Sequence, residues 1–300
     1  MKAVFYKILV SLSQRCGPWL FSLVSRGIAA GYFLLCPGRV LVGLRFYAVL
    51  FPRKSRAYHL WCTWRQFQNF TTVFLDRFRL QDEAGIRYTF QGERALQTII
   101  DAGNGGILLM SHMGNWEVAA RLLQQNLNGL RLLLYMGARA SQAIENLQKE
   151  AVADSGIGII GVAETGGSPL DIIEGIRFLR SGGIVSMAGD VLWRNDQAAV
   201  KVPFLGKNIR LPEAPFALAM AAGAPLVVFF ALRTGKGRYH FQAAEPIFID
   251  RTDRSHRRAA IQAAARRYAA LLEDTVRKNP CQWYHFEPFL QAGIPDVIRQ

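Results

Sequence analysis

Twelve residues near the middle of the chain read Gly106-Ile107-Leu108-Leu109-Met110-Ser111-His112-Met113-Gly114-Asn115-Trp116-Glu117. The short apolar run over 106–111 predicts a buried β-strand. Asn115 is a preferred N-cap residue and Glu117 would lie in the first turn of a helix, where the helix dipole favours a carboxylate, so we expect a helix over 116–126. A buried strand followed at once by a helix is typical of an α/β fold, and it places His112 at the end of the strand.

The same alternation continues on both sides of this stretch, from about residue 90 onward. It predicts one α/β domain with a central, mostly parallel sheet flanked by helices. We expect strands over 106–111, 131–136, 157–160, 184–188 and 226–232. We expect helices over 94–102, 116–126, 141–154, 169–182, 212–222 and 254–277, with Ser168 as the N-cap of the fourth.

Basic residues are concentrated at the start of the chain. The 300 residues carry a formal net charge of +14, and ten basic residues precede the first acidic one, Asp76. Long apolar blocks at 16–25 and 27–38 lie between these cations. This mixture is expected of a segment in the headgroup region of an anionic bilayer. We therefore divide the chain into a basic, apolar helical membrane segment over 1–56 and a single α/β domain over 57–300, which begins with an amphipathic helix over 57–80.

A membrane-spanning helix normally needs about 20 mainly apolar residues. Arg26, Arg39 and Arg45 interrupt every run of that length before Arg53. We therefore expect the first segment to lie on the membrane. A single tilted span over 27–51, with its arginines buried or reaching the interface, is the alternative.

Cysteine and histidine spacing indicates no metal site and no disulfide framework. The four cysteines form no C-x-x-C pair and lie in apolar or aromatic surroundings, which fits a reduced, cytosolic environment. No metal-ligand spacing emerges from the remaining histidines, and we assign them no role; they are His59, His240, His256 and His285.

The residues around His112 are suited to acyl transfer. Moving an acyl group from a thioester to an alcohol requires a base, a group that orients it, and hydrogen-bond donors for the oxyanion. His112 would be the base, while Gly114 and Asn115 would form a turn and present the free N–H groups of the new helix. Glu117 is five residues from His112, so the two side chains meet only if this turn intervenes. The alternative is a core histidine held by backbone groups.

The chain resembles the bacterial lipid A late acyltransferases, the lauroyl and myristoyl transferases, and their lipid-mannoside acyltransferase relatives. The resemblance rests on residues 111–117, on Gly189-Asp190 with Val202-Pro203-Phe204-Leu205-Gly206, and on Pro280-Cys281-Gln282-Trp283. It implies an enzyme on the cytoplasmic face of the inner membrane that uses an acyl carrier protein or coenzyme A thioester as co-substrate and holds no bound cofactor.

The resemblance also implies roles for three side chains. His112 would be the base, Glu117 the acid of an H-x4-D/E motif, and Asp190 a second carboxylate facing His112. Asp190 follows the expected strand over 184–188, at the sheet edge where α/β folds commonly place chemistry.

Four basic residues lie between Asp190 and Pro212, in what we expect to be a loop: Arg194, Lys201, Lys207 and Arg210. They are candidates for contacting a phosphate of the donor, an acidic carrier protein or a lipid headgroup. The alternative is that solvent alone surrounds them.

Together these features predict a membrane-surface acyltransferase that moves a fatty acyl group onto a hydroxyl of a membrane lipid. One alternative is a thioesterase or lipid hydrolase that uses the same pocket. Another is a noncatalytic protein that binds anionic lipid or nucleic acid. We expect no nucleic-acid partner, because such a site would interleave basic residues with exposed aromatic ones and contain little apolar sequence.

Overall fold

The computed structural model describes residue 9 and residues 11–13, 15–80, 85–138, 156–163, 169–192, 194, 196–250 and 256–290. The expected helix over 141–154 and the expected N-cap Ser168 lie outside the described residues.

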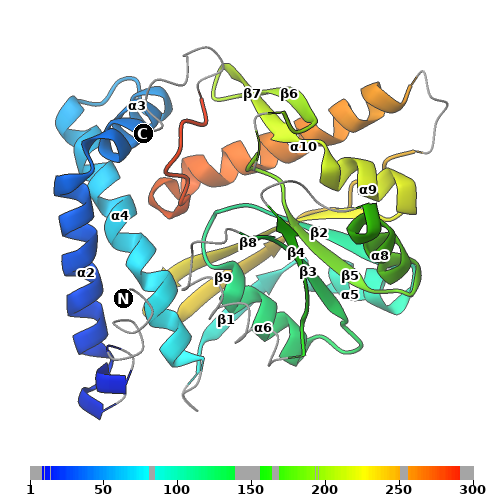
Figure 1. Cartoon of the computed structure of the whole chain (residues 1–300), viewed down its shortest axis with the longest axis horizontal. Helices are drawn as coiled ribbons and strands as arrows, with labels where there is room; N and C mark the ends of the chain where they lie inside the picture. Colours follow the sequence, from blue (N-terminus) through cyan, green and yellow to red (C-terminus); the bar gives the residue numbers. More distant parts are fainter. Residues whose placement is uncertain are drawn as a thin grey trace.

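A seven-stranded sheet forms the centre of the described part of the chain (Figure 1). Its spatial order is β1 (Arg87–Gln91), β9 (Arg238–Ala243), β8 (Leu226–Gly235), β2 (Gly106–Met110), β5 (Ile184–Ala188), β3 (Leu132–Ala138) and β4 (Gly158–Ala163). From β8 to β4 each neighbouring pair is parallel, whereas β9 is antiparallel to β8 and parallel to β1. The predicted mostly parallel sheet is therefore confirmed.

Helices cover both faces of this sheet. Side chains of successive strand residues point to opposite faces. Leu108 packs in one apolar cluster with α5 (Glu93–Asp101) and α6 (Trp116–Asn126). Leu109 packs in another cluster, to which α8 (Pro169–Arg180), α9 (Ala214–Ala222) and α10 (Arg257–Lys278) contribute.

The region expected to be a loop after Asp190 is a β-hairpin of β6 (Ala199–Phe204) and β7 (Lys207–Pro212). Leu205 and Gly206 form its two-residue turn with φ of 51° and 73°, and positive φ at both central residues is what a type I′ hairpin turn requires. The expected helix over 212–222 also begins later, at Ala214, because Pro212 completes β7.

Between residue 18 and the first strand of the sheet, three helices lie together at one side of it (Figure 1): α2 (Pro18–Leu35), α3 (Pro37–Leu50) and α4 (Arg56–Arg79). The alternative of a single span over 27–51 is wrong, because the chain leaves the helix at Cys36 and a new helix starts at Pro37. Proline has no N–H with which to continue the preceding helix.

Among the described residues, α2 is long and apolar enough to cross a membrane, judged by length and composition alone. The expected helix over 57–80 is confirmed as α4, which packs against both α2 and α3. The division of the chain at residue 56 stays a prediction.

Candidate functional site

Parallel strand register brings His112 and Asp190 together. In the pairing of β2 with β5, Met110 lies opposite Ala188, the last residue of its strand. His112 and Asp190 each follow two residues later, so both emerge at the carboxyl edge of neighbouring strands. The N–H of Gly189 donates to Met110 O at 2.8 Å, which extends the pairing to the site.

The two side chains form a hydrogen-bonded pair. His112 Nδ1 lies 2.9 Å from Asp190 Oδ1, and the His112 backbone N–H donates to Asp190 Oδ2 at 2.8 Å. The imidazole is 36% exposed, whereas the carboxylate is 0% exposed. Because an ionised carboxylate can only accept, Nδ1 carries the proton of the neutral ring and Nε2 carries the lone pair. The ring is thus oriented by a buried acid and is accessible from solvent.

Asp190 is held in its ionised form. Burial raises the pKa of Asp190, but the charge and hydrogen bond of His112, the charge of His285 and the hydrogen bond from Trp283 outweigh it and lower this pKa to about 2. A carboxylate that stays charged stabilises a proton taken up by the neighbouring imidazole.

Gly114 and Asn115 form the link between His112 and α6. The Asn115 side chain accepts a hydrogen bond from Val118 N, which confirms it as the N-cap. The N–H of Gly114 donates to Gln282 O at 2.9 Å, and the N–H of Asn115 donates to Ala231 O at 3.1 Å. Their own amides are thus occupied, and a role for these two residues in binding an oxyanion depends on the dipole of α6 behind them.

Glu117 lies in the first turn of α6 and is 1% exposed. Its Oε1 is 3.4 Å from Arg121 Nη2, one helical turn further on. Asp190 is the carboxylate paired with the His112 imidazole. A direct part for Glu117 in the reaction stays a prediction.

The C-terminal segment forms a further wall of the site. Met113 and Trp283 form an antiparallel bridge, and the Tyr284 N–H donates to His112 O at 2.8 Å. Trp283 is 1% exposed, and its indole Nε1 donates to Asp190 Oδ2 at 2.9 Å. Trp283 entered the sequence argument only as part of a family motif, since nothing in its local pattern indicates a contact with residue 190.

The structure also places His285 beside the pair. Its ring centroid lies 6.5 Å from that of His112. The sequence indicates no role for His285, because a histidine far along the chain has no local signal that it returns to the site. In the described part of the chain, no group of three or more potential ligands could hold a metal ion.

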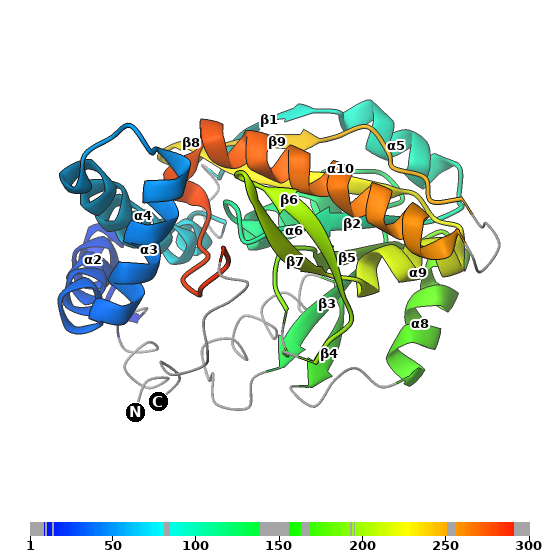
Figure 2. The same ribbon diagram turned by 90° about the horizontal axis from the view of Figure 1, so that it is seen from above.

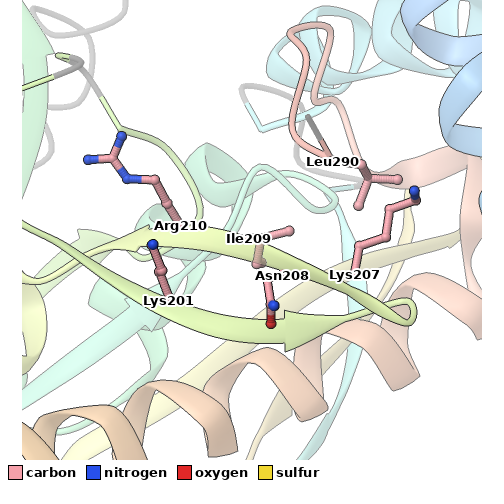
Figure 3. A pocket seen from close by; sticks show the side chains of 6 residues that line it. All are labelled: Lys201, Lys207, Asn208, Ile209, Arg210 and Leu290. Atoms are coloured by element: carbon pink, nitrogen blue, oxygen red, sulfur yellow. The ribbon is translucent and has the colours of Figure 1, made fainter. Parts of the chain in front are cut away.

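Three of the four predicted basic residues line one groove of about 450 Å³ beside the hairpin (Figure 3). Lys201, Lys207 and Arg210 come from β6 and β7, and Leu290 comes from the C-terminal segment. Arg194 instead forms an ion pair with Asp196, with Nε 2.7 Å from Oδ1.

The groove and the His112 site share the C-terminal segment. Phe289, next to Leu290, packs on both Trp283 and His285 at ring distances of 4.7 Å. Phe204 of the hairpin also contacts Trp283, at 5.6 Å. The groove and the imidazole therefore belong to one continuous region of the molecule.

Comparison with known proteins gives two findings. Residues 48–291 match the model of a protein family described as bacterial lipid A biosynthesis acyltransferase. The chain is also similar to the phosphatidylinositol mannoside acyltransferase of Mycolicibacterium smegmatis, with 26% identity over 212 residues, and to the enzyme of that name from Mycobacterium tuberculosis, with 27% identity over 213 residues. These matches cover 68% of this chain but 62% and 60% of the two relatives, so the chain spans about three fifths of their length.

Proposed function

Because this chain belongs to the bacterial lipid A biosynthesis acyltransferase family, we propose that it moves a fatty acyl group from a thioester to a hydroxyl of a membrane glycolipid. The observation that carries the proposal is the accessible His112 imidazole paired with the buried Asp190 carboxylate. A base oriented in this way is what an alcohol nucleophile requires. The relatives act on a phosphatidylinositol mannoside, which supports a sugar hydroxyl as acceptor.

In the proposed reaction, Nε2 of His112 takes the proton of the acceptor hydroxyl as its oxygen attacks the thioester carbonyl carbon. The C–S bond then breaks, and the leaving thiolate takes the proton from the imidazolium. Asp190 holds Nδ1–H throughout and stabilises the positive ring. The positive end of the α6 dipole, which begins at the N-cap Asn115 three residues after His112, favours the negative charge that develops on the carbonyl oxygen.

The basic groove suits the anionic part of the donor. Coenzyme A carries phosphates, and an acyl carrier protein carries a phosphopantetheine arm on an acidic surface. Lys201, Lys207 and Arg210 supply cations for either donor, and Leu290 supplies an apolar contact. The donor is a co-substrate here, and no resident cofactor is needed.

The N-terminal helices suit attachment to the membrane that holds the acceptor. Large apolar side chains are exposed along α2, and α3 and α4 add Leu41, Leu60 and Trp61. Both donors occur in the cytosol, and the four cysteines are free thiols. We therefore infer that the chain works at the cytoplasmic face of the inner membrane.

The test is transfer of radiolabelled palmitate from palmitoyl-coenzyme A and palmitoyl-acyl carrier protein to phosphatidylinositol monomannoside and to an under-acylated lipid A precursor. General base catalysis contributes about 10² to 10⁴ in rate, so His112→Ala should lose a factor of that size. His240→Ala is the control, because His240 lies on β9 and its Nδ1 is 2.8 Å from Thr89 Oγ1 on the neighbouring edge strand β1.

Near-wild-type transfer by His112→Ala would show that His112 is not the base. Thioester hydrolysis without acceptor that is faster than transfer would favour the hydrolase alternative. Binding to anionic vesicles with neither reaction would favour a noncatalytic lipid-binding protein.

A further inference from the structure

A second imidazole, that of His285, faces the candidate site. The antiparallel bridge between Met113 and Trp283, with the bond from Tyr284 N to His112 O, fixes the position of this part of the C-terminal segment. The His285 ring then lies edge-on to the His112 ring, at 77° and 6.5 Å between centroids. Both views of the fold show the segment between the N-terminal helices and the hairpin (Figures 1 and 2).

The two ring nitrogens of His285 are in different environments. Nδ1 lies 3.1 Å from the carbonyl oxygen of Glu287. A carbonyl oxygen only accepts, so Nδ1 carries the proton and Nε2 of the neutral ring has a lone pair. Within the described ranges no protein donor bonds to this Nε2, and it is not among the buried polar atoms that lack a partner. The residue is half-buried, and this nitrogen is left as a hydrogen-bond acceptor for a bound molecule.

The surroundings of His285 favour the neutral form of its ring. Removal from water lowers the pKa of His285, and His112 lowers it further, whereas Asp190 raises it. Trp283 and Phe289 pack on the ring at 5.2 Å and 4.7 Å. The group hydrogen-bonded to His285 is a carbonyl oxygen, so this ring is not held by a directly bonded carboxylate as the His112 ring is by Asp190.

We propose that Nε2 of His285 accepts a hydrogen bond from a second hydroxyl of the acceptor headgroup, next to the hydroxyl that His112 deprotonates. This inference rests on the proposed function, and it names the acceptor class: a sugar or polyol headgroup with neighbouring hydroxyls. The two rings are close enough for adjacent hydroxyls of one headgroup to reach both. His285 transfers no proton and acts as a positioning residue that selects the acceptor.

Two substitutions test the roles of Nδ1 and Nε2 of His285 separately. His285→Asn keeps an amide N–H near Nδ1, which can still donate to Glu287 O, but it leaves nothing at the position of Nε2. His285→Gln places its amide further out, near Nε2. The acceptors are phosphatidylinositol monomannoside, its analogues with single mannose hydroxyls removed, and diacylglycerol, which offers one hydroxyl.

Loss of one net hydrogen bond should raise the acceptor KM of His285→Asn by about three- to tenfold, with kcat nearly unchanged. His285→Gln should restore part of this loss. For the analogue that lacks the contacted hydroxyl, wild type should already have the higher KM and His285→Asn should add nothing. Diacylglycerol should be a poor acceptor for both proteins.

An equal fold-change in KM for every acceptor would mean a structural role and would overturn the proposal, as would an unchanged KM for the mannoside. Calorimetric binding of the same lipids in mixed micelles, without donor, tests the role of His285 separately from the proposed transfer reaction. Absence of transfer by wild type removes the proposed function, whereas equal binding of the intact headgroup by wild type and His285→Asn removes the role of His285.

Discussion

Asp190 combines full burial with hydrogen bonds from the His112 ring, the His112 backbone and the Trp283 indole. These contacts link the ionisation of Asp190 to the folding free energy. The pKa is lowered from 3.8 to about 2, so the folded state binds this proton less readily than the unfolded state. The contribution to stability is present above about pH 4 and is lost as the pH falls toward about 2.

We therefore expect Asp190→Asn to lower the free energy of unfolding at neutral pH by about 2 kcal/mol. The gap to wild type should shrink as the pH falls below about 4. Urea unfolding of both proteins across this range is the measurement. A gap that stays constant down to about pH 2 would contradict the linkage.

Gly114 is required by close packing. Its φ is +74°, and a Cβ at this position would lie 1.9 Å from the carbonyl oxygen of Ala231 in β8. Gly206, in the hairpin turn, has nearly the same φ of +73° but has nothing within 4 Å of such a Cβ. The two glycines therefore separate the cost of the backbone conformation from the cost of the clash.

Gly206→Ala should cost about 1 to 2 kcal/mol of stability and leave transfer activity close to wild type. Gly114→Ala should cost clearly more and also lose activity, because backbone displacement there moves His112. Thermal unfolding and transfer rates measure both effects. Similar losses in the two variants would show that the contact with Ala231 does not matter.

At the scale of the element, α2 exposes apolar side chains to an extent unusual for a helix of a soluble domain. Phe21 and Ala29 are its buried residues. The large exposed side chains are Trp19, Leu23, Ile28, Tyr32, Leu34 and Leu35. Such a surface is stable when it is covered by lipid.

Leu34→Glu with Leu35→Glu should therefore weaken binding to anionic vesicles by at least about tenfold, since each buried leucine contributes about 1.5 to 3 kcal/mol. Leu170→Glu with Ile172→Glu on α8 is the control, because it adds the same two charges at apolar side chains that are 71% and 54% exposed. Sedimentation with vesicles measures binding. Equal losses for both changes would exclude α2 as the specific contact.

At the scale of the whole molecule, α4 connects the N-terminal helices to the candidate site. Its Gln66 donates to Trp283 O at 2.5 Å, and its Asn69 donates to Cys281 O at 3.1 Å. The buried Asp76 accepts hydrogen bonds from Arg233 of β8 and Tyr239 of β9. The C-terminal wall of the site is thus held from the side that carries the exposed apolar surface.

Gln66→Ala should destabilise the protein by about 1 to 3 kcal/mol, because it leaves a buried carbonyl without its donor. It should also reduce kcat/KM, because Trp283 orients Asp190. Gln68→Ala is the control on the same helix, since Gln68 bonds Arg26 O in an exposed contact at 3.4 Å. Unfolding and transfer measurements on both variants check this, and unchanged kcat/KM in Gln66→Ala would argue against the connection.

Local sequence determined the elements and the first half of the site. Apolar runs, the Asn115 cap and proline positions act between residues that are close in the chain, so they predicted α6, His112 at a strand end, and the strands β2, β3, β4, β5 and β8, whereas β1 and β9 were not predicted. The hairpin β6–β7 was missed because the Leu205-Gly206 turn lacks the asparagine or aspartate usual at its first position.

Only the tertiary structure decided which side chains meet. The neighbour relation of β2 and β5, and their register, set Asp190 against His112. The return of residues 281–285 beside His112 added Trp283 and His285. These contacts join residues far apart in sequence, and their formation depends on which strands pair and on burial of the whole core, neither of which a local pattern encodes.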